Sequence, residues 1–202
     1  MDEDPVYKKR NKEDTQMKTA ILSAVFALAA GMLFATETNL YFNPEFKSKT
    51  DKKGKMTILG HWYEGKASID GKYEGSPVIR LEQVKVNWGG FNCTVSSSFN
   101  PKYVLKPGKY VFTVWCKPES VTSSIYMFRF VQPAGQKRIR PTRSYKGSEL
   151  PPVGKWTELV MNFEIKPGDT GNSFGFAAYS ATSIGPKTVL FAKPRITCES
   201  EE

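Results

Sequence analysis

The chain has 202 residues, a formal net charge of +9, three cysteines and one histidine. With a single histidine and no paired-cysteine motif, the composition gives almost no support for a zinc site. The basic balance favours anionic partners such as acidic polysaccharides, phosphorylated lipids or nucleic acid, and a plain solvated basic surface is the alternative.

The N-terminal part holds an apolar segment, 19–35, behind a tail, 1–18, with five basic and five acidic residues. A basic flank followed by a short apolar run is typical of an export signal. Seventeen helical residues span only about 25 Å, against about 30 Å of hydrocarbon. A cleaved signal peptide is therefore favoured over a single membrane anchor. A start at Met17 would suit a signal peptide, whereas a start at Met1 would favour an anchor.

Both alternatives place everything after Ala35 outside the cytoplasmic membrane. We therefore expect a periplasmic, cell-surface or extracellular protein, with the membrane as a partner only if the apolar segment is retained. This exported part carries 24 Lys and Arg against 15 Asp and Glu. Its length suits one domain, expected at 37–198.

The exported part consists of short aromatic and β-branched runs broken by Gly, Pro and Asn, a pattern that predicts strands. Prolines followed by glycines at 107–108 and 167–168 predict type II turns. The expected strands are 56–63, 78–86, 90–97, 109–117, 124–132, 156–165, 173–179 and 188–197. About eight strands without intervening helices indicate an all-β, antiparallel β-sandwich or jelly roll.

The strand expected at 109–117 has large side chains on both of its faces. Phe112 and Cys116 belong to one alternating set and Trp115 to the other. An aromatic outer face lines a cleft or an interface, or it is covered by a loop. A disulfide between Cys93 and Cys116 is possible only if their strands are neighbours, and the odd number of cysteines, with Cys198, leaves at least one free thiol.

Four segments carry a resemblance to a known family. They are an Asn-Leu opening strand at 39–46, an LKPGK turn and strand at 105–115, a Gly-Lys-Trp strand at 154–163 and a closing strand at 188–196. These segments resemble family 4/9-type carbohydrate-binding modules, which are jelly rolls of the galactose-binding-like superfamily. The resemblance implies a non-catalytic domain that binds sugar.

Family members often hold a structural calcium ion, with an acid in the last strand. Here the segment 191–196 reads FAKPRI, with Lys and Pro at those positions. Calcium needs six to eight oxygen ligands, mostly anionic. We therefore expect no metal and no other cofactor.

Catalysis is not expected. A glycosidase needs two positioned carboxylates, and the candidate acids are scattered along a basic chain. These acids are Glu45, Glu82, Glu158 and Glu164. The sole histidine, His61, lies at an aromatic strand end, where a packed imidazole is the simpler interpretation.

Sugar recognition needs flat aromatic rings beside polar and charged groups. Trp88 is followed by two glycines, which would let a partner approach closely, although it could equally pack at a strand end. The segment 129–146 holds six basic residues and no acid, and Pro133, Gly135 and Pro141 predict a loop in its middle. This loop either binds an anion through its arginines or is only solvated. The candidate ligand-binding residues are Trp88, Tyr126, Arg129, Arg138, Arg140, Arg143, Tyr145 and Tyr179.

The sequence thus predicts an exported, non-catalytic module that binds an envelope or extracellular glycan, with an anionic one as an option. The alternative is a structural or adhesive subunit of an envelope, appendage or virion that uses the sandwich faces for protein contacts. Export does not favour nucleic acid as the partner.

Overall fold

The computed structural model divides into two units, 1–38 and 39–202. The residues it describes are 38–50, 52, 56–59, 61–64, 66–82, 91–100, 102–103, 106–180 and 187–199. The helix expected at 19–35 and the candidate Trp88 lie outside these ranges. No helix in the described part is long and apolar enough to cross a membrane.

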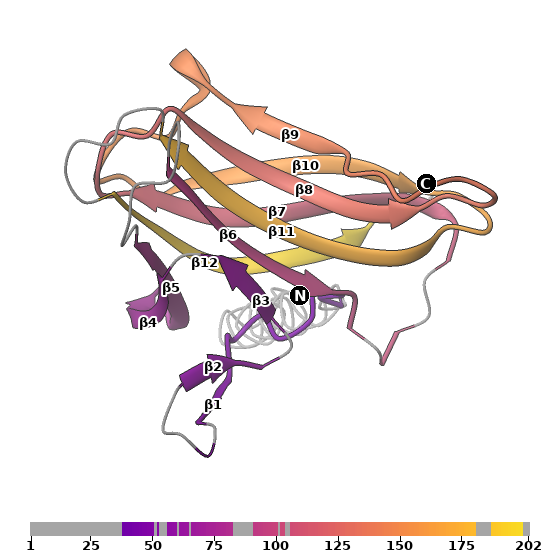
Figure 1. The fold of residues 1–202 in the computed structure, drawn as a ribbon, viewed down its shortest axis with the longest axis horizontal. Coiled ribbons are helices and arrows are strands. Elements are labelled where there is room, and N and C mark those ends of the chain that lie inside the picture. The colour runs from indigo at the N-terminus through magenta and orange to yellow at the C-terminus, as the bar shows by residue number, and fades with distance from the viewer. Residues whose placement is uncertain are drawn as a thin grey trace, which may run out of the picture. The chain divides into compact units, whose positions relative to one another are not determined.

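Two antiparallel sheets of five strands make up most of the described residues (Figure 1). Sheet I has the order β10 (Thr157–Ile165), β7 (Gly108–Pro118), β12 (Thr188–Cys198), β5 (Ser76–Glu82) and β4 (Lys66–Tyr73). Sheet II has the order β3 (His61–Glu64), β6 (Phe91–Ser98), β11 (Thr170–Ser180), β8 (Ser124–Gln132) and β9 (Thr142–Tyr145). A hairpin of β1 (Ser48–Thr50) and β2 (Met56–Ile58) and a 3-10 turn, η1 (Gly147–Glu149), complete the described elements.

The core lies between the two sheets, as the alternation of apolar residues predicts. Phe112 of β7 and Phe174 of β11 are fully buried and meet with ring centroids 5.7 Å apart. Phe176 of β11 and Phe191 of β12 approach to 4.4 Å in the same way. The antiparallel, all-β sandwich predicted from the sequence is thereby confirmed for the described residues.

Residues 39–41 join the start of the domain to β12. The Asn39 side chain accepts from the backbone N–H of Ile196 at 3.1 Å and donates to the carbonyl of Pro194 at 3.0 Å. Leu40 N–H donates to the Ile196 carbonyl at 2.8 Å. The Asn-Leu pair noted in the sequence therefore ties two segments that are 155–157 residues apart.

Three expectations need correction. The run 56–63 forms two strands, because a turn at Leu59 sends β2 to β1 and β3 to β6. Cys116 is a free, buried thiol, so it does not pair with Cys93, and their strands belong to opposite sheets. The strands β1, β4 and β9 were not expected from the sequence.

Candidate functional site

The basic segment 129–146 starts in β8 and folds back along it as an arm. Its middle, 133–141, is a loop, as its Pro and Gly residues predict, apart from one isolated bridge at Ile139. A turn closes through the Gln136 N–H and the Pro133 carbonyl at 3.1 Å. Ile139 then exchanges two backbone hydrogen bonds with Val131, at 2.8 and 3.1 Å. The returning chain continues into β9, which pairs with β8.

Two arginines of this arm lie over two phenylalanine rings of β8. The Arg140 guanidinium carbon is 4.1 Å from the centre of the Phe128 ring, and that of Arg138 is 4.6 Å from the centre of Phe130. Since Ile139 pairs with β8 through its backbone, its two neighbours project to the same side of the arm. The alternation of β8 places both rings on the outer face of sheet II, opposite the core residues Ile125 and Met127.

A glycine beneath Phe128 makes this arrangement possible. Gly175 of β11 is the register partner of Phe128. A Cβ atom at position 175 would collide with the Phe128 ring and with the carbonyl oxygen of Val95. Phe128 is fully buried between this glycine and the guanidinium of Arg140.

Hydroxyl groups border the stacked pairs. Tyr126, half-buried and two residues before Phe128, receives a hydrogen bond from the Ser124 hydroxyl at 2.7 Å. Arg138 donates to the Ser173 hydroxyl at 3.2 Å. The Ser144 hydroxyl, on the register partner of Tyr126, is buried and has no hydrogen-bond partner among the described residues.

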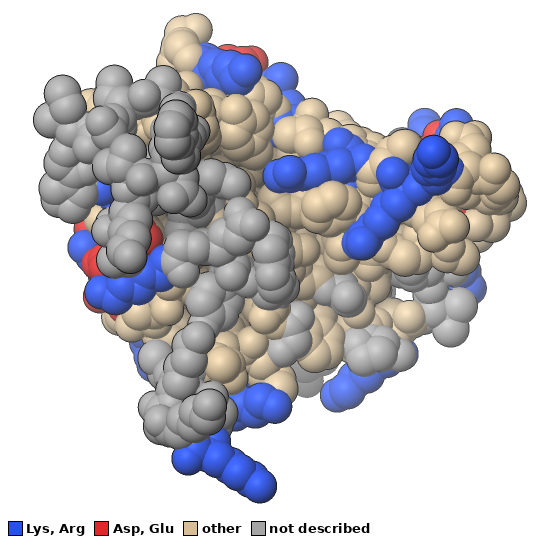
Figure 2. All heavy atoms as spheres, viewed as in Figure 1, with Lys and Arg blue, Asp and Glu red and all other residues tan. Residues whose placement is uncertain are grey.

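We call this set the arginine–phenylalanine surface, and define it as Tyr126, Phe128, Phe130, Arg138 and Arg140. Its guanidinium groups are exposed and its rings are partly or fully buried. Figure 2 shows Lys and Arg atoms outnumbering acidic atoms at the end of the molecule where β8 turns toward β9. The surface combines apolar rings, hydroxyls and positive charge in one place.

The four arginines of the arm differ in how their charge is balanced. Arg129 is 2.7 Å from Asp169, and Arg143 is 2.8 Å from Glu149. Within the described part of the chain, neither Arg138 nor Arg140 has a carboxylate at ion-pair distance. Of the four arginines, only these two therefore keep an unbalanced charge, and among the described residues Lys137 and Lys146 of the arm have no ion pair either.

Arg129 points into the sandwich, so it does not join its neighbours on the outer face. Its side chain is 4% exposed and donates to Asp169 and to the Asn172 side chain, both at 2.7 Å. A further bond reaches the carbonyl of Glu164 in β10. Arg129 thus links β8 to the turn between β10 and β11.

Tyr145, like Arg129, connects the two sheets. It is buried, and its hydroxyl contacts the backbone of Val160 in β10. Arg143 covers the Tyr145 ring at 5.0 Å. A shallow hollow of about 450 Å³ lies between the edge strands β9 and β10. It is lined by Pro141, Thr142, Arg143, Val160, Met161 and Asn162.

Of the candidates, Tyr126, Arg138 and Arg140 come together, while Arg129, Arg143 and Tyr145 serve the edge between the sheets. Tyr179 is half-buried at the other end of the β8–β11 pairing, opposite Ser124. Sequence reasoning did not select Phe130, and it considered Phe128 only as part of the run 126–129. Their two-residue spacing from Tyr126, on the face opposite Ile125 and Met127, was the available signal.

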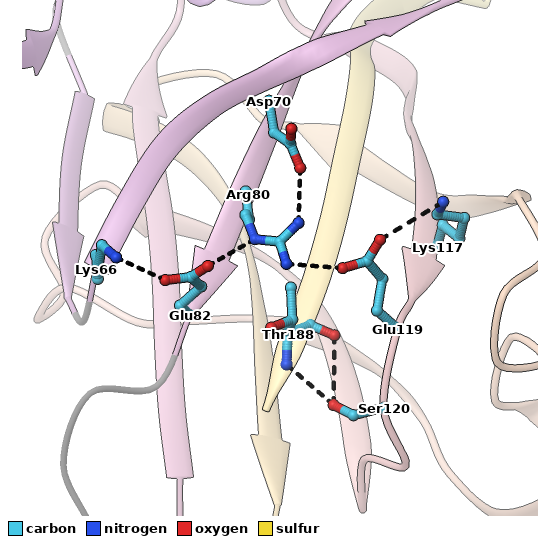
Figure 3. A network of polar contacts seen from close by, with 8 residues as sticks. All are labelled: Lys66, Asp70, Arg80, Glu82, Lys117, Glu119, Ser120 and Thr188. Carbon is cyan, nitrogen blue, oxygen red and sulfur yellow. Dashed lines mark hydrogen bonds and ion pairs between the residues drawn. The ribbon is translucent and has the colours of Figure 1, made fainter. Parts of the chain in front are cut away.

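Sheet I carries a different polar cluster on its outer face (Figure 3). Arg80 contacts Asp70 at 2.7 Å, Glu82 at 2.6 Å and Glu119 at 3.0 Å. Hydrogen bonds from Lys66, first, and from Arg80 lower the pKa of Glu82. The Glu82 carboxylate therefore stays ionised, and its oxygens are engaged by Lys66 and Arg80. This fits a structural role between strands better than proton transfer.

Sheet I also carries an aromatic cluster, whose ring faces are occupied. Tyr73 and Trp156 stack with centroids 4.2 Å apart. Lys193 lies 5.3 Å from the Tyr73 ring and Lys117 lies 5.8 Å from the Trp156 ring. Trp115 packs against Tyr73 at 5.4 Å. Trp115, the outward aromatic residue of β7, is thus partly covered by these neighbours.

His61 packs against Tyr41 and Phe46, with ring centroids 5.9 and 5.7 Å away. Its Nδ1 is 3.0 Å from the Leu59 carbonyl oxygen. Burial, partly offset by this bond, lowers its pKa. Within the described ranges no three His, Cys, Asp or Glu residues gather in a way that could hold a metal ion.

No family model and no curated protein matches the sequence. Among solved structures, the fold resembles the Clostridium thermocellum endo-1,4-β-D-xylanase 10B fragment that comprises CBM22-1 and GH10 modules with bound xylohexaose. The TM-score is 0.52 at 12% identity, over 82% of this chain and 28% of the xylanase chain.

Two further neighbours have TM-scores of 0.48. TmCBM61 in complex with β-1,4-galactotriose is 13% identical over 80% of this chain and 99% of that one. The enzymatically active domain of tailspike protein 4 from bacteriophage CBA120 is 14% identical over 71% of this chain and 20% of that one. The described residues share a β-sandwich fold with part of the xylanase fragment.

Proposed function

We propose that this protein is an exported, non-catalytic carbohydrate-binding module of the jelly-roll type, related to families 4 and 9, that recognises an envelope or extracellular glycan. The observation that carries the proposal is the arginine–phenylalanine surface. The half-buried rings of Tyr126 and Phe130, with the bordering hydroxyls, offer a sugar both apolar contact and hydrogen bonds.

Two further observations support a binding role without catalysis. The described carboxylates of the polar cluster on sheet I, Asp70, Glu82 and Glu119, are held by Arg80. His61 is packed among aromatic rings. The fold shared with carbohydrate-binding modules agrees with this role but does not by itself give a ligand.

A glycan array with the purified chain tests the proposal. We expect binding to a restricted set of oligosaccharides, without release of product sugars. Tyr126→Ala and Phe130→Ala should each weaken binding about tenfold, the scale of one lost aromatic contact. Ile139→Ala is the matched control, because it changes the same arm at an exposed side chain between the two arginines.

Absence of binding to every neutral and acidic glycan at high protein concentration would contradict the proposal. A defined oligomer without any ligand, measured by size exclusion with light scattering, would instead favour the structural or adhesive alternative. Equal losses in Ile139→Ala and Phe130→Ala would show that the arm matters only for folding.

A further inference from the structure

The stacked arginines are held in place before any ligand arrives. Backbone bonds join Ile139 to Val131, and the N–H of Arg129 to the carbonyl of Pro141 at 3.0 Å. Both guanidinium groups also rest on phenylalanine rings. A fixed arginine loses less conformational entropy on binding than a free one.

The position of each guanidinium over a ring also decides which of its groups remain available. A guanidinium that lies over a ring keeps its N–H donors in the guanidinium plane, where they match the two oxygens of an oxyanion. Arg138 uses one nitrogen on the Ser173 hydroxyl. No described residue accepts a hydrogen bond from the guanidinium of Arg140.

Arg138 and Arg140 are close enough for both to contact one charged ligand. Side chains two residues apart on an extended strand are separated by about 7 Å. Neither Arg138 nor Arg140 has a described carboxylate partner, unlike Arg129 and Arg143 of the same arm. Two like charges kept close together without a counter-charge are costly unless an anion neutralises them.

We infer that the arginine–phenylalanine surface selects saccharides that carry an oxyanion, a carboxylate or a sulfate, and that Arg138 and Arg140 bind this group directly. The inference rests on the proposed function and names the ligand class for the same site. The rings hold the guanidinium groups in position, so the planar shape of these groups contributes to recognition of the oxyanion as well as their charge.

The test compares glycans that differ only in charge. Calorimetry would measure binding of the full chain to oligogalacturonate of defined length and to its methyl ester, which is the same sugar without charge. A sulfated galactan and the unsulfated galactan form the second pair and distinguish the source of the oxyanion. Single-stranded DNA of similar charge controls for attraction to any polyanion.

Three double variants accompany these ligands. Arg138→Gln with Arg140→Gln removes both charges from the surface. Lys72→Gln with Lys109→Gln removes the same charge from exposed positions on sheet I and is the matched control. Arg138→Lys with Arg140→Lys keeps the charge but loses the planar fork.

We expect at least one charged glycan to bind about tenfold or more tightly than its neutral partner. This preference should disappear in the glutamine variant, fall in the lysine variant and persist in the control on sheet I. Equal binding of charged and neutral sugars would overturn the inference and leave the proposed function standing. Equal binding of DNA, or an equal loss in the control variant, would also overturn it. Failure to bind any glycan would refute the proposed function itself.

Discussion

The hydroxyl of Tyr145 makes two hydrogen bonds with one residue of the opposite sheet, Val160. It accepts from the Val160 N–H at 2.7 Å and donates to the Val160 carbonyl at 2.6 Å. Both residues lie on edge strands, Tyr145 on β9 and Val160 on β10. Together with the Arg129 bond to the Glu164 carbonyl, this contact occupies backbone groups on the open edge of β10.

Tyr145→Phe should lower the free energy of unfolding by about 1–3 kcal/mol, because it removes both bonds and leaves the Val160 backbone without its partner. Urea denaturation followed by tryptophan fluorescence measures the change. The glycan affinity of the folded variant should stay at the parent value, because Tyr145 lies away from the stacked arginines. An unfolding free energy equal to that of the parent would show that water replaces the hydroxyl without cost.

The Arg129–Asp169 pair makes the free energy of unfolding depend on pH in the acidic range. Burial raises the pKa of Asp169, but the Lys166 N–H and the Arg129 guanidinium outweigh it and lower the pKa below its ordinary value. The stability that a lowered folded-state pKa contributes is fully present above the unfolded pKa of about 3.9 and is lost as pH falls through the folded-state pKa. We expect unfolding free energy to decline below about pH 5.

Asp169→Asn tests the assignment. It should cost about 3–5 kcal/mol at neutral pH, because the buried Arg129 charge loses its partner. The variant should also show a flatter pH dependence than the parent below about pH 5. Denaturation curves at several pH values give the unfolding free energy of the parent and of the variant. If both free energies fall equally with pH, other carboxylates cause the acid sensitivity.

Gly175→Ala should disturb both the fold and the site. The added methyl group meets the Phe128 ring, and overpacking of this kind costs about 1–3 kcal/mol. Displacement of Phe128 also moves the support of Arg140. Thermal unfolding and glycan binding should therefore fall together. Gly135→Ala is a useful control, since the space around position 135 is open although its positive φ adds some strain.

The described cysteines should differ in reactivity. Cys198 is exposed, whereas Cys116 is fully buried and burial raises the pKa of its thiol well above the usual range. Iodoacetamide should modify Cys198 in the native protein and Cys116 only after unfolding. Peptide mapping by mass spectrometry distinguishes the two positions. Rapid modification of Cys116 under native conditions would contradict the buried assignment.

Regular alternation let the sequence predict most strands, but it could not predict β4 (Lys66–Tyr73). Only Ala67 and Ile69 of that strand pack against the core, and a bulge between Ile69 and Lys72 breaks the period. β9 has four residues and begins directly after Pro141, so its signal was equally weak.

The alternation of β8 already placed Arg129 in line with Ile125 and Met127, which are core residues. The run of like charges led instead to the prediction that Arg129 is exposed and binds a ligand. Its partner Asp169 lies 40 residues further along the chain. Sequence could thus show that Arg129 faces inward, but only the folded arrangement shows which carboxylate neutralises it.

The position of β12 sets the order in which the domain assembles. This strand, 188–198, lies between β7 and β5, at the centre of sheet I, and also receives the bonds of Asn39 and Leu40. A growing chain that has not yet produced residue 188 therefore leaves facing edges of β7 and β5 open. Sheet I can close only after synthesis has passed β12, so its folding depends on contacts between distant segments, which form slowly.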